Sequence, residues 1–221
     1  MEVMNKREDL MAEATASIKD SRRKLRYRWW FANVGGLIIA FLLFSLIGHG
    51  ITGPHGDDLT FAQDIAHTLG LLVVGLIVFP VQRAALGPWL SVSTARIIVA
   101  TVVFTAAFQF GAKIYRPPAD WILGFTALGS AAWVSFQGFK GQRLVWTIAT
   151  ILGFCIGMAF TTPVMFAAIR SGIFDPESPT LLDHTITWVL GAGMTGIFGG
   201  YVSGWPLSRL LIPSHSSSRA A

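Results

Sequence analysis

Long stretches without a single charged residue constrain this chain more than any other feature of its sequence. Only 13% of its 221 residues are charged, about half of the roughly 25% that is usual in a soluble domain. Thirteen of the 29 charged side chains lie within the first 28 residues, so the rest of the chain consists largely of uncharged segments. The sequence therefore predicts an integral membrane protein.

Six uncharged stretches approach the length of about 20 residues that a helix needs to cross a bilayer. They cover residues 29–48, 65–82, 97–112, 121–139, 144–169 and 185–208. Capping-box sequences at residues 60–63 and 180–183 mark the starts of the second and sixth helices. We therefore expect an all-α, polytopic bundle of six transmembrane helices over residues 29–212. A basic amphipathic segment at 1–28 precedes this domain, and a Ser-rich tail at 213–221 follows it.

The basic residues are divided unequally between the two ends of these predicted helices. With the N-terminus inside, fourteen Lys and Arg residues fall on the inner side, and only Lys113, Arg116 and Arg170 fall on the outer side. Basic residues in short loops mark the cytoplasmic side. We therefore expect both termini in the cytoplasm and the protein in the cell (inner or plasma) membrane. This orientation accounts for the net charge of +5 without a nucleic-acid partner.

A dense cluster of basic residues precedes the first predicted span, and it consists of Arg22, Arg23, Lys24, Arg26 and Arg28. Apolar residues at helical spacing accompany the cluster, so the segment could lie on an anionic inner leaflet. Each basic residue near such a surface contributes about 1 kcal/mol. The cluster predicts a lipid-binding surface or a dock for a cytosolic partner. The alternative is that it only holds the N-terminus inside.

Histidines gather near the predicted outer face. His49 ends the first span, His184 begins the sixth, and His67 shares a helix face with Asp64 near the start of the second. Imidazole and carboxylate ligands at one depth suit a zinc, copper or iron ion, or a haem held by two imidazoles. The alternative is that these histidines simply face water. No charged residue lies deep in a span and no catalytic motif is present, so the sequence names no catalytic residue and does not favour an enzyme.

Glycines recur at intervals of four residues in the last two predicted spans. They are Gly196, Gly200 and Gly204 in the sixth span, and Gly153 and Gly157 in the fifth. Such spacing lets helix backbones approach closely in a membrane. We expect tight packing within the chain, with a homo-oligomer face or a sliding surface as the alternatives.

The second and fifth spans share a spacing that suggests an internal repeat. Pro80 follows Gly70 by ten residues, and Pro163 follows Gly153 by ten residues. Six spans divide into two halves of three with opposite orientations, the arrangement of a 3+3 inverted repeat. Each proline removes one backbone hydrogen bond and could act as a hinge. Coincidence is the alternative, because these residue types are common in membrane helices.

Three classes of function fit this sequence. The favoured one is a small multi-pass membrane transporter or channel for a neutral or amphipathic solute. The second is a non-catalytic subunit or assembly factor of a larger membrane complex. The partners expected are therefore an anionic inner leaflet and a second copy of the chain or a larger membrane complex. The third is a membrane redox or metal-binding protein that uses the outer histidines.

Cysteine labelling tests the predicted orientation. In a Cys155→Ala background, single cysteines at positions 56, 118 and 176 should react with an impermeant thiol reagent added to intact cells. Cysteines at positions 20, 87 and 141 should stay unlabelled, because they lie on the inner side. Labelling of this second set would place the basic ends outside and contradict the orientation.

Overall fold

The computed structural model describes residues 2–52, 61–114, 143–172 and 180–212, and every regular element within them is an α-helix. The helices are α1 (Glu2–Thr52), α2 (Phe61–Leu86), α3 (Thr94–Ile114), α5 (Arg143–Arg170) and α6 (Leu181–Leu211). Each contains one predicted span, extended at both ends. The predicted span at 121–139 lies outside the described residues, and so do Thr60 and the side chain of Gln63, the two ends of the capping box predicted at 60–63.

Three of the described helices are long and apolar enough to cross a membrane. The qualifying segments are Met11–Ile47 in α1, Asp64–Leu86 in α2 and Val145–Arg170 in α5. α3 contributes a shorter apolar helix, Thr94–Ala106. α6 is 31 residues long but is not among the three, because its many glycines lower its hydropathy. These helices support the prediction of a helical membrane protein.

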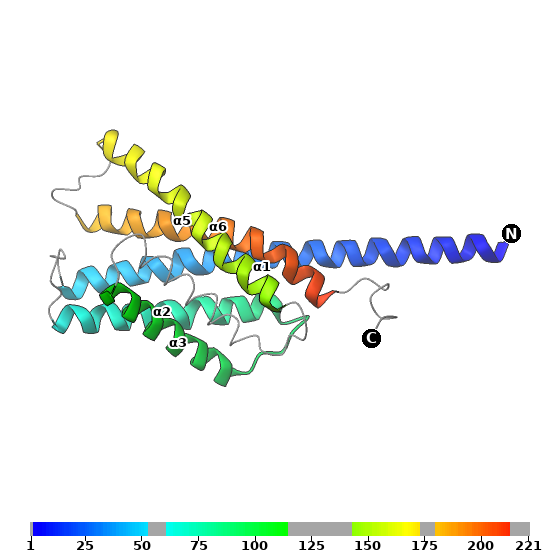
Figure 1. Ribbon diagram of the computed structural model, residues 1–221, viewed down its shortest axis with the longest axis horizontal. Helices are drawn as coiled ribbons and strands as arrows, with labels where there is room; N and C mark the ends of the chain where they lie inside the picture. The colour runs from blue at the N-terminus through cyan, green and yellow to red at the C-terminus, as the bar shows by residue number, and fades with distance from the viewer. Residues whose placement is uncertain (1, 53–60, 115–142, 173–179, 213–221) are drawn as a thin grey trace.

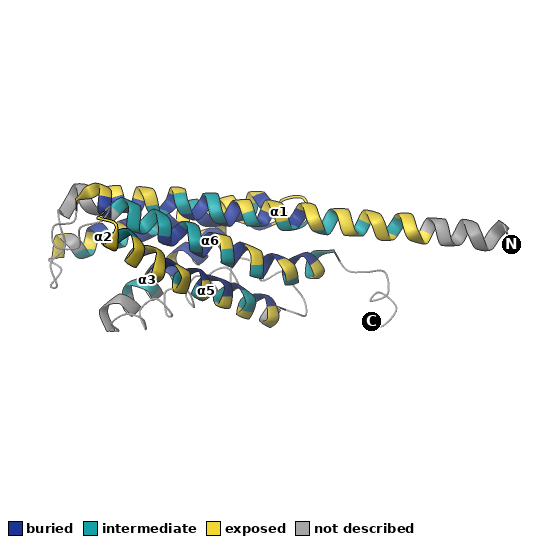
Figure 2. Ribbon diagram, turned by 90° about the horizontal axis from the view of Figure 1, so that it is seen from above, coloured by how far each residue is buried: buried dark blue, intermediate teal, exposed yellow. Residues whose placement is uncertain are grey.

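Large apolar side chains face outward along the bundle, as a lipid environment requires. On α5, Val145, Ile148, Leu152 and Ile156 are exposed at intervals of three or four residues, which places them on one face of the helix. An exposed apolar stripe of this length would be unfavourable in water. Figure 2 shows exposed residues on the outer faces of the helices and buried residues between them.

α1 lies at the centre of the described helices. It packs against α2 on one side and α6 on the other, while α3 packs on α2 and α5 packs on α6. The spatial order is therefore α3, α2, α1, α6, α5. In Figure 1 the chain runs in one direction along α1, α3 and α5 and in the opposite direction along α2 and α6.

α1 is a single helix of 51 residues, roughly 76 Å long at 1.5 Å per residue. Its N-terminal part projects beyond the other helices (Figure 1), and contact with them begins near Arg22. The helix continues without a break across residues 28 and 29, where the sequence changes from charged to apolar. The basic cluster and the first predicted span therefore belong to one and the same helix.

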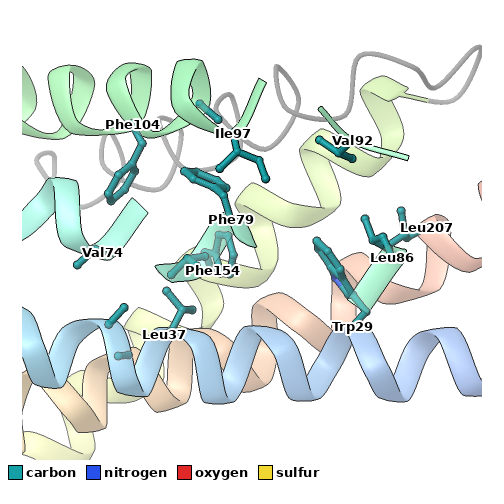
Figure 3. Packing of buried hydrophobic residues seen from close by; sticks show 14 of the residues in the cluster. Trp29, Leu37, Val74, Phe79, Leu86, Val92, Ile97, Phe104, Phe154 and Leu207 are labelled. Atoms are coloured by element: carbon teal, nitrogen blue, oxygen red, sulfur yellow. The ribbon is translucent and has the colours of Figure 1, made fainter. Parts of the chain in front are cut away.

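The core is built around Trp29, where α1, α5 and α6 meet. Trp29 is fully buried and packs edge-on against the buried ring of Trp146 on α5, with the ring centroids 6.0 Å apart. Figure 3 shows Leu86 and Leu207 close to Trp29, and Phe79 and Phe154 further along the same core.

Glycines bring α6 into backbone contact with both of its neighbours. A Cβ atom on Gly196 would lie 2.8 Å from the carbonyl oxygen of Asn33 in α1. On the other side of α6, a Cβ atom on Gly153 of α5 would lie 2.9 Å from the Cα atom of Gly199. Gly200 and Gly204 also face α1, and Gly157 faces Thr195 of α6. The glycine series therefore packs helices within this chain.

The start of α6 confirms the capping box predicted at residues 180–183. The backbone N–H of Asp183 donates to the Thr180 hydroxyl at 3.2 Å, and the backbone N–H of Thr180 donates to the Asp183 carboxylate at 2.8 Å. These bonds satisfy backbone donors that a helix start leaves without partners.

Substitution at a glycine contact should weaken the bundle. Gly196→Ala forces its new methyl group against the α1 backbone, and we expect a loss of about 1–3 kcal/mol in the free energy of unfolding, as for other overpacked sites. Gly35→Ala is the matched control, because a Cβ atom there meets no atom within 4 Å. Denaturation in detergent, followed by circular dichroism, measures both. Equal stability of the two variants would show that this close contact does not hold the bundle together.

Candidate functional site

A groove of about 580 Å³ lies between α1 and α6, on the side of the bundle. It falls within the range of roughly 300–1,000 Å³ that is usual for small-molecule sites. Nine of the residues that the structure describes line it: Arg23, Arg26, Tyr27 and Trp30 from α1, and Ile197, Phe198, Gly200, Tyr201 and Trp205 from α6. Aromatic rings form most of its walls.

The groove exists because the two helices touch at glycines while large side chains flank the contact. A Cβ atom on Gly200 would lie 3.1 Å from the Cα atom of Trp30, so the floor of the groove is backbone. Trp30 is held in place because its Nε1–H donates to the carbonyl oxygen of Ile197 at 3.1 Å. Tyr201 and Trp205 are exposed at the opening.

The groove is polar at one end and apolar at the other. α1 and α6 are antiparallel, and the glycine contacts place Arg26 level with Gly204. Arg23 and Arg26 therefore lie at the end near the C-terminus of α6, and Ile197 and Phe198 lie at the other end. The guanidinium of Arg23 is 5.6 Å from the centroid of the Tyr27 ring. The described part of the chain places no carboxylate in the groove lining.

The structure separates the five basic residues of the predicted lipid surface into three environments. Arg22 Nε donates to the carbonyl oxygen of Ile212 at 2.9 Å, and Arg28 donates to the carbonyl oxygen of Ala84 at 3.2 Å. These two side chains therefore satisfy backbone carbonyls near the C-terminal ends of α6 and α2, where a positive charge is also favoured. Lys24 pairs with Asp20 at 2.8 Å. Arg23 and Arg26 line the groove.

A chain of buried polar side chains lies next to the groove, inside the bundle. Trp29 Nε1 donates to the hydroxyl of Ser203 at 2.8 Å, and Gln82 Nε2 donates to the side-chain oxygen of Asn33 at 3.0 Å. Asn33 in turn donates to the carbonyl oxygen of Trp29 at 2.8 Å. These bonds connect α2, α1 and α6. Sequence reasoning did not single out Asn33 and Gln82, although Asn33 is the one amide side chain in its apolar stretch.

The predicted outer histidine site is only partly described. The Nδ1 atom of His67 lies 2.6 Å from Gln109 Oε1 on α3, and the ring also packs edge-on against Phe44. An amide oxygen only accepts, so the Nδ1–H of His67 is the donor in this bond. Metal-bound histidines often make such a bond with their second ring nitrogen.

His49 and His184 lie on α1 and α6 at the same end of the bundle as His67, but their side chains are outside the described set. Asp64 lies one turn before His67 on α2. Among the described side chains, no group of three His, Cys, Asp or Glu residues could hold a metal ion. The metal or haem site therefore stays a prediction, which elemental analysis and an absorbance spectrum of the purified protein would test.

The predicted hinge prolines lie inside continuous helices. α2 runs through Pro80 and α5 runs through Pro163, and α6 contains a third proline, Pro206. The glycines that correspond in the expected repeat have different neighbours. A Cβ atom on Gly70 would meet the Phe44 ring of α1, whereas Gly153 meets α6. These contacts give the repeat no support.

No protein-family model matches this chain, and neither the curated proteins nor the solved structures contain a significant match. The function is therefore inferred from the residues and their geometry alone.

The bond between His67 and Gln109 should couple α2 to α3. His67→Ala and Gln109→Ala should each lower the free energy of unfolding, and the double variant should lose less than the sum, with a coupling of about 0.6 kcal/mol or more. Thr68→Ala combined with Gln109→Ala is the control, because the Thr68 hydroxyl bonds within its own helix. Additive losses for His67 and Gln109 would show that this bond does not contribute to stability.

Proposed function

We propose that this protein is a small multi-pass membrane transporter for an amphipathic, lipid-like solute that binds in the groove between α1 and α6. The observation that carries the proposal is the groove itself, with aromatic walls, an apolar end and two arginines at the other end. A molecule with a polar head and an apolar tail matches both ends at once.

The packing of the helices favours an amphipathic solute over a neutral, water-soluble one. The space between α1, α2, α5 and α6 is filled by fully buried side chains such as Trp29, Leu37, Val74 and Trp146. The groove instead lies on the outer side of the α1–α6 pair, beside exposed apolar residues such as Phe31. A solute that partitions into the bilayer can reach it sideways from the lipid.

The proposal includes the topology expected from the sequence: six spans with both termini in the cytoplasm of the inner or plasma membrane. The alternating directions of the described helices support it (Figure 1). So do Arg22 and Arg28, which bring positive charge to the C-terminal ends of α6 and α2, the ends assigned to the cytoplasmic side. In this orientation the arginine end of the groove lies near the inner leaflet. Hinges at Pro80 and Pro163 remain part of the proposal.

A second candidate function is a subunit or assembly factor of a membrane complex. The projecting part of α1 favours it, because most side chains from Met11 to Asp20 are exposed and this part extends beyond the other described helices (Figure 1). A cytosolic partner or a second copy of the chain could bind there. The redox or metal-binding alternative depends on His49, His67 and His184.

Lipid movement across a vesicle bilayer tests the transport proposal. We expect purified protein in phosphatidylcholine vesicles to move a fluorescent short-chain phospholipid between leaflets several-fold faster than protein-free vesicles do. A membrane-impermeant quencher measures the fraction of label that has moved. Ile197→Trp should slow this movement because the larger ring fills the groove.

Ile148→Trp is the matched control, because Ile148 is an exposed residue on the outer face of α5, away from the groove. It should move lipid as fast as the unmodified protein. Movement no faster than in protein-free vesicles would contradict the transport proposal. Equal slowing by both variants would show that the groove is not the path.

A further inference from the structure

We propose that the groove between α1 and α6 selects an anionic phospholipid from the inner leaflet, with Arg23 and Arg26 binding its phosphate headgroup. The inference rests on the proposed function in one respect, since it names the chemical class of the molecule that enters the same groove. Its occupant is a bilayer lipid and not a soluble phosphate, because most of the groove wall is apolar.

Charge complementarity argues for an anionic headgroup. Among the described residues that line the groove, Arg23 and Arg26 are the two that carry a charge, and none is acidic. Lys24, in the same stretch of helix, is already paired with Asp20. Arg209 lies over the Trp205 ring, with its guanidinium carbon 3.8 Å from the ring centroid, and adds positive charge at the same end. Arginine binds phosphate oxygens in a planar, two-pronged geometry.

The change in polarity along the groove matches the long axis of a lipid. From Arg23 to Trp30 the α1 wall rises by about 10 Å at 1.5 Å per residue. Over the same distance the lining changes from guanidinium groups to indole and phenol rings, and then to Ile197 and Phe198. Tyrosine and tryptophan favour the level of the lipid headgroups. A phosphate at the arginine end therefore places the acyl chains toward the middle of the bilayer.

Exposure of the groove wall gives a direct way to identify its occupant. The Tyr201 side chain is 74% exposed, so a photo-crosslinking amino acid there should not disturb the core. Leu152 on α5 supplies a control position. It is 53% exposed and, next to Gly153, lies at nearly the same depth as Gly199.

The experiment uses the full chain in phosphatidylcholine vesicles that contain a minor fraction of phosphatidylglycerol. After illumination, mass spectrometry gives the ratio of the two lipids among the adducts. At position 201 we expect phosphatidylglycerol to be enriched over its share of the bilayer by about fivefold or more, the factor that corresponds to one favourable basic residue. At position 152 the adduct ratio should equal the bulk ratio.

Two charge variants separate binding in the groove from general attraction to the surface. R23Q/R26Q should return the ratio at position 201 to the bulk value. K19Q/K24Q removes the same charge from the same helix but leaves the groove lining intact, and it should keep the enrichment. Lipid movement is measured again in vesicles of this mixed composition, so that both measurements refer to the same bilayer.

The inference would be overturned by a bulk ratio at position 201, by equal enrichment at positions 201 and 152, or by adducts mainly to a second copy of the chain. Equal loss of enrichment in the two charge variants would also overturn it.

Enrichment at position 201 without faster lipid movement supports this inference and contradicts transport. Movement without enrichment overturns this inference and leaves the proposed function standing. The comparison of positions 201 and 152 uses unmodified arginines, so it holds even if R23Q/R26Q does not fold.

Discussion

Backbone contact between α1 and α6 is the constraint on which the other features depend. Lipid gives no hydrophobic driving force between helices, so close packing and hydrogen bonds must hold them together. A Cβ atom on Gly196 would lie 2.8 Å from the α1 backbone, which leaves no room for it, and one on Gly200 would be tight at 3.1 Å. That approach brings Trp29 within hydrogen-bond distance of Ser203 and aligns the tryptophan with Trp146 of α5. It also makes the groove, because the side chains that flank a glycine contact must diverge around it.

The residues of the basic cluster have different partners, although they are close together in the sequence. A helix turns by 100° per residue, so neighbouring residues in the run face different surroundings. Arg22 and Arg28 reach the ends of two helices, Lys24 faces Asp20, and Arg23 and Arg26 face the groove. Net charge alone, which the sequence supplies, does not reveal this division.

The sequence predicted the helices well because the length of an uncharged stretch is a local property. Each described span lies inside a helix, and the cap at Thr180 has the expected bonds. The predicted start of the first span, after residue 28, lies inside the continuous helix α1, because a change from charged to apolar residues does not interrupt backbone hydrogen bonds.

The sequence could not predict which helices pack against each other, since helices that are apolar on every side do not show which face meets which partner. The groove joins residues about 170 positions apart, and no spacing rule connects Trp30 with Ile197. The outer histidines remain a prediction, with a hydrogen-bond partner described for His67 alone.

The continuity of α1 has a mechanical consequence. Its projecting part is roughly twenty residues long, which corresponds to about 30 Å of helix. The same rod passes between α2 and α6 at the centre of the bundle. A tilt or rotation of the projecting part would therefore move the contacts of α1 with α2 and with α6 at the same time. A molecule bound near the N-terminus of this helix would be held at a fixed distance from the bundle, because the helix between them is continuous.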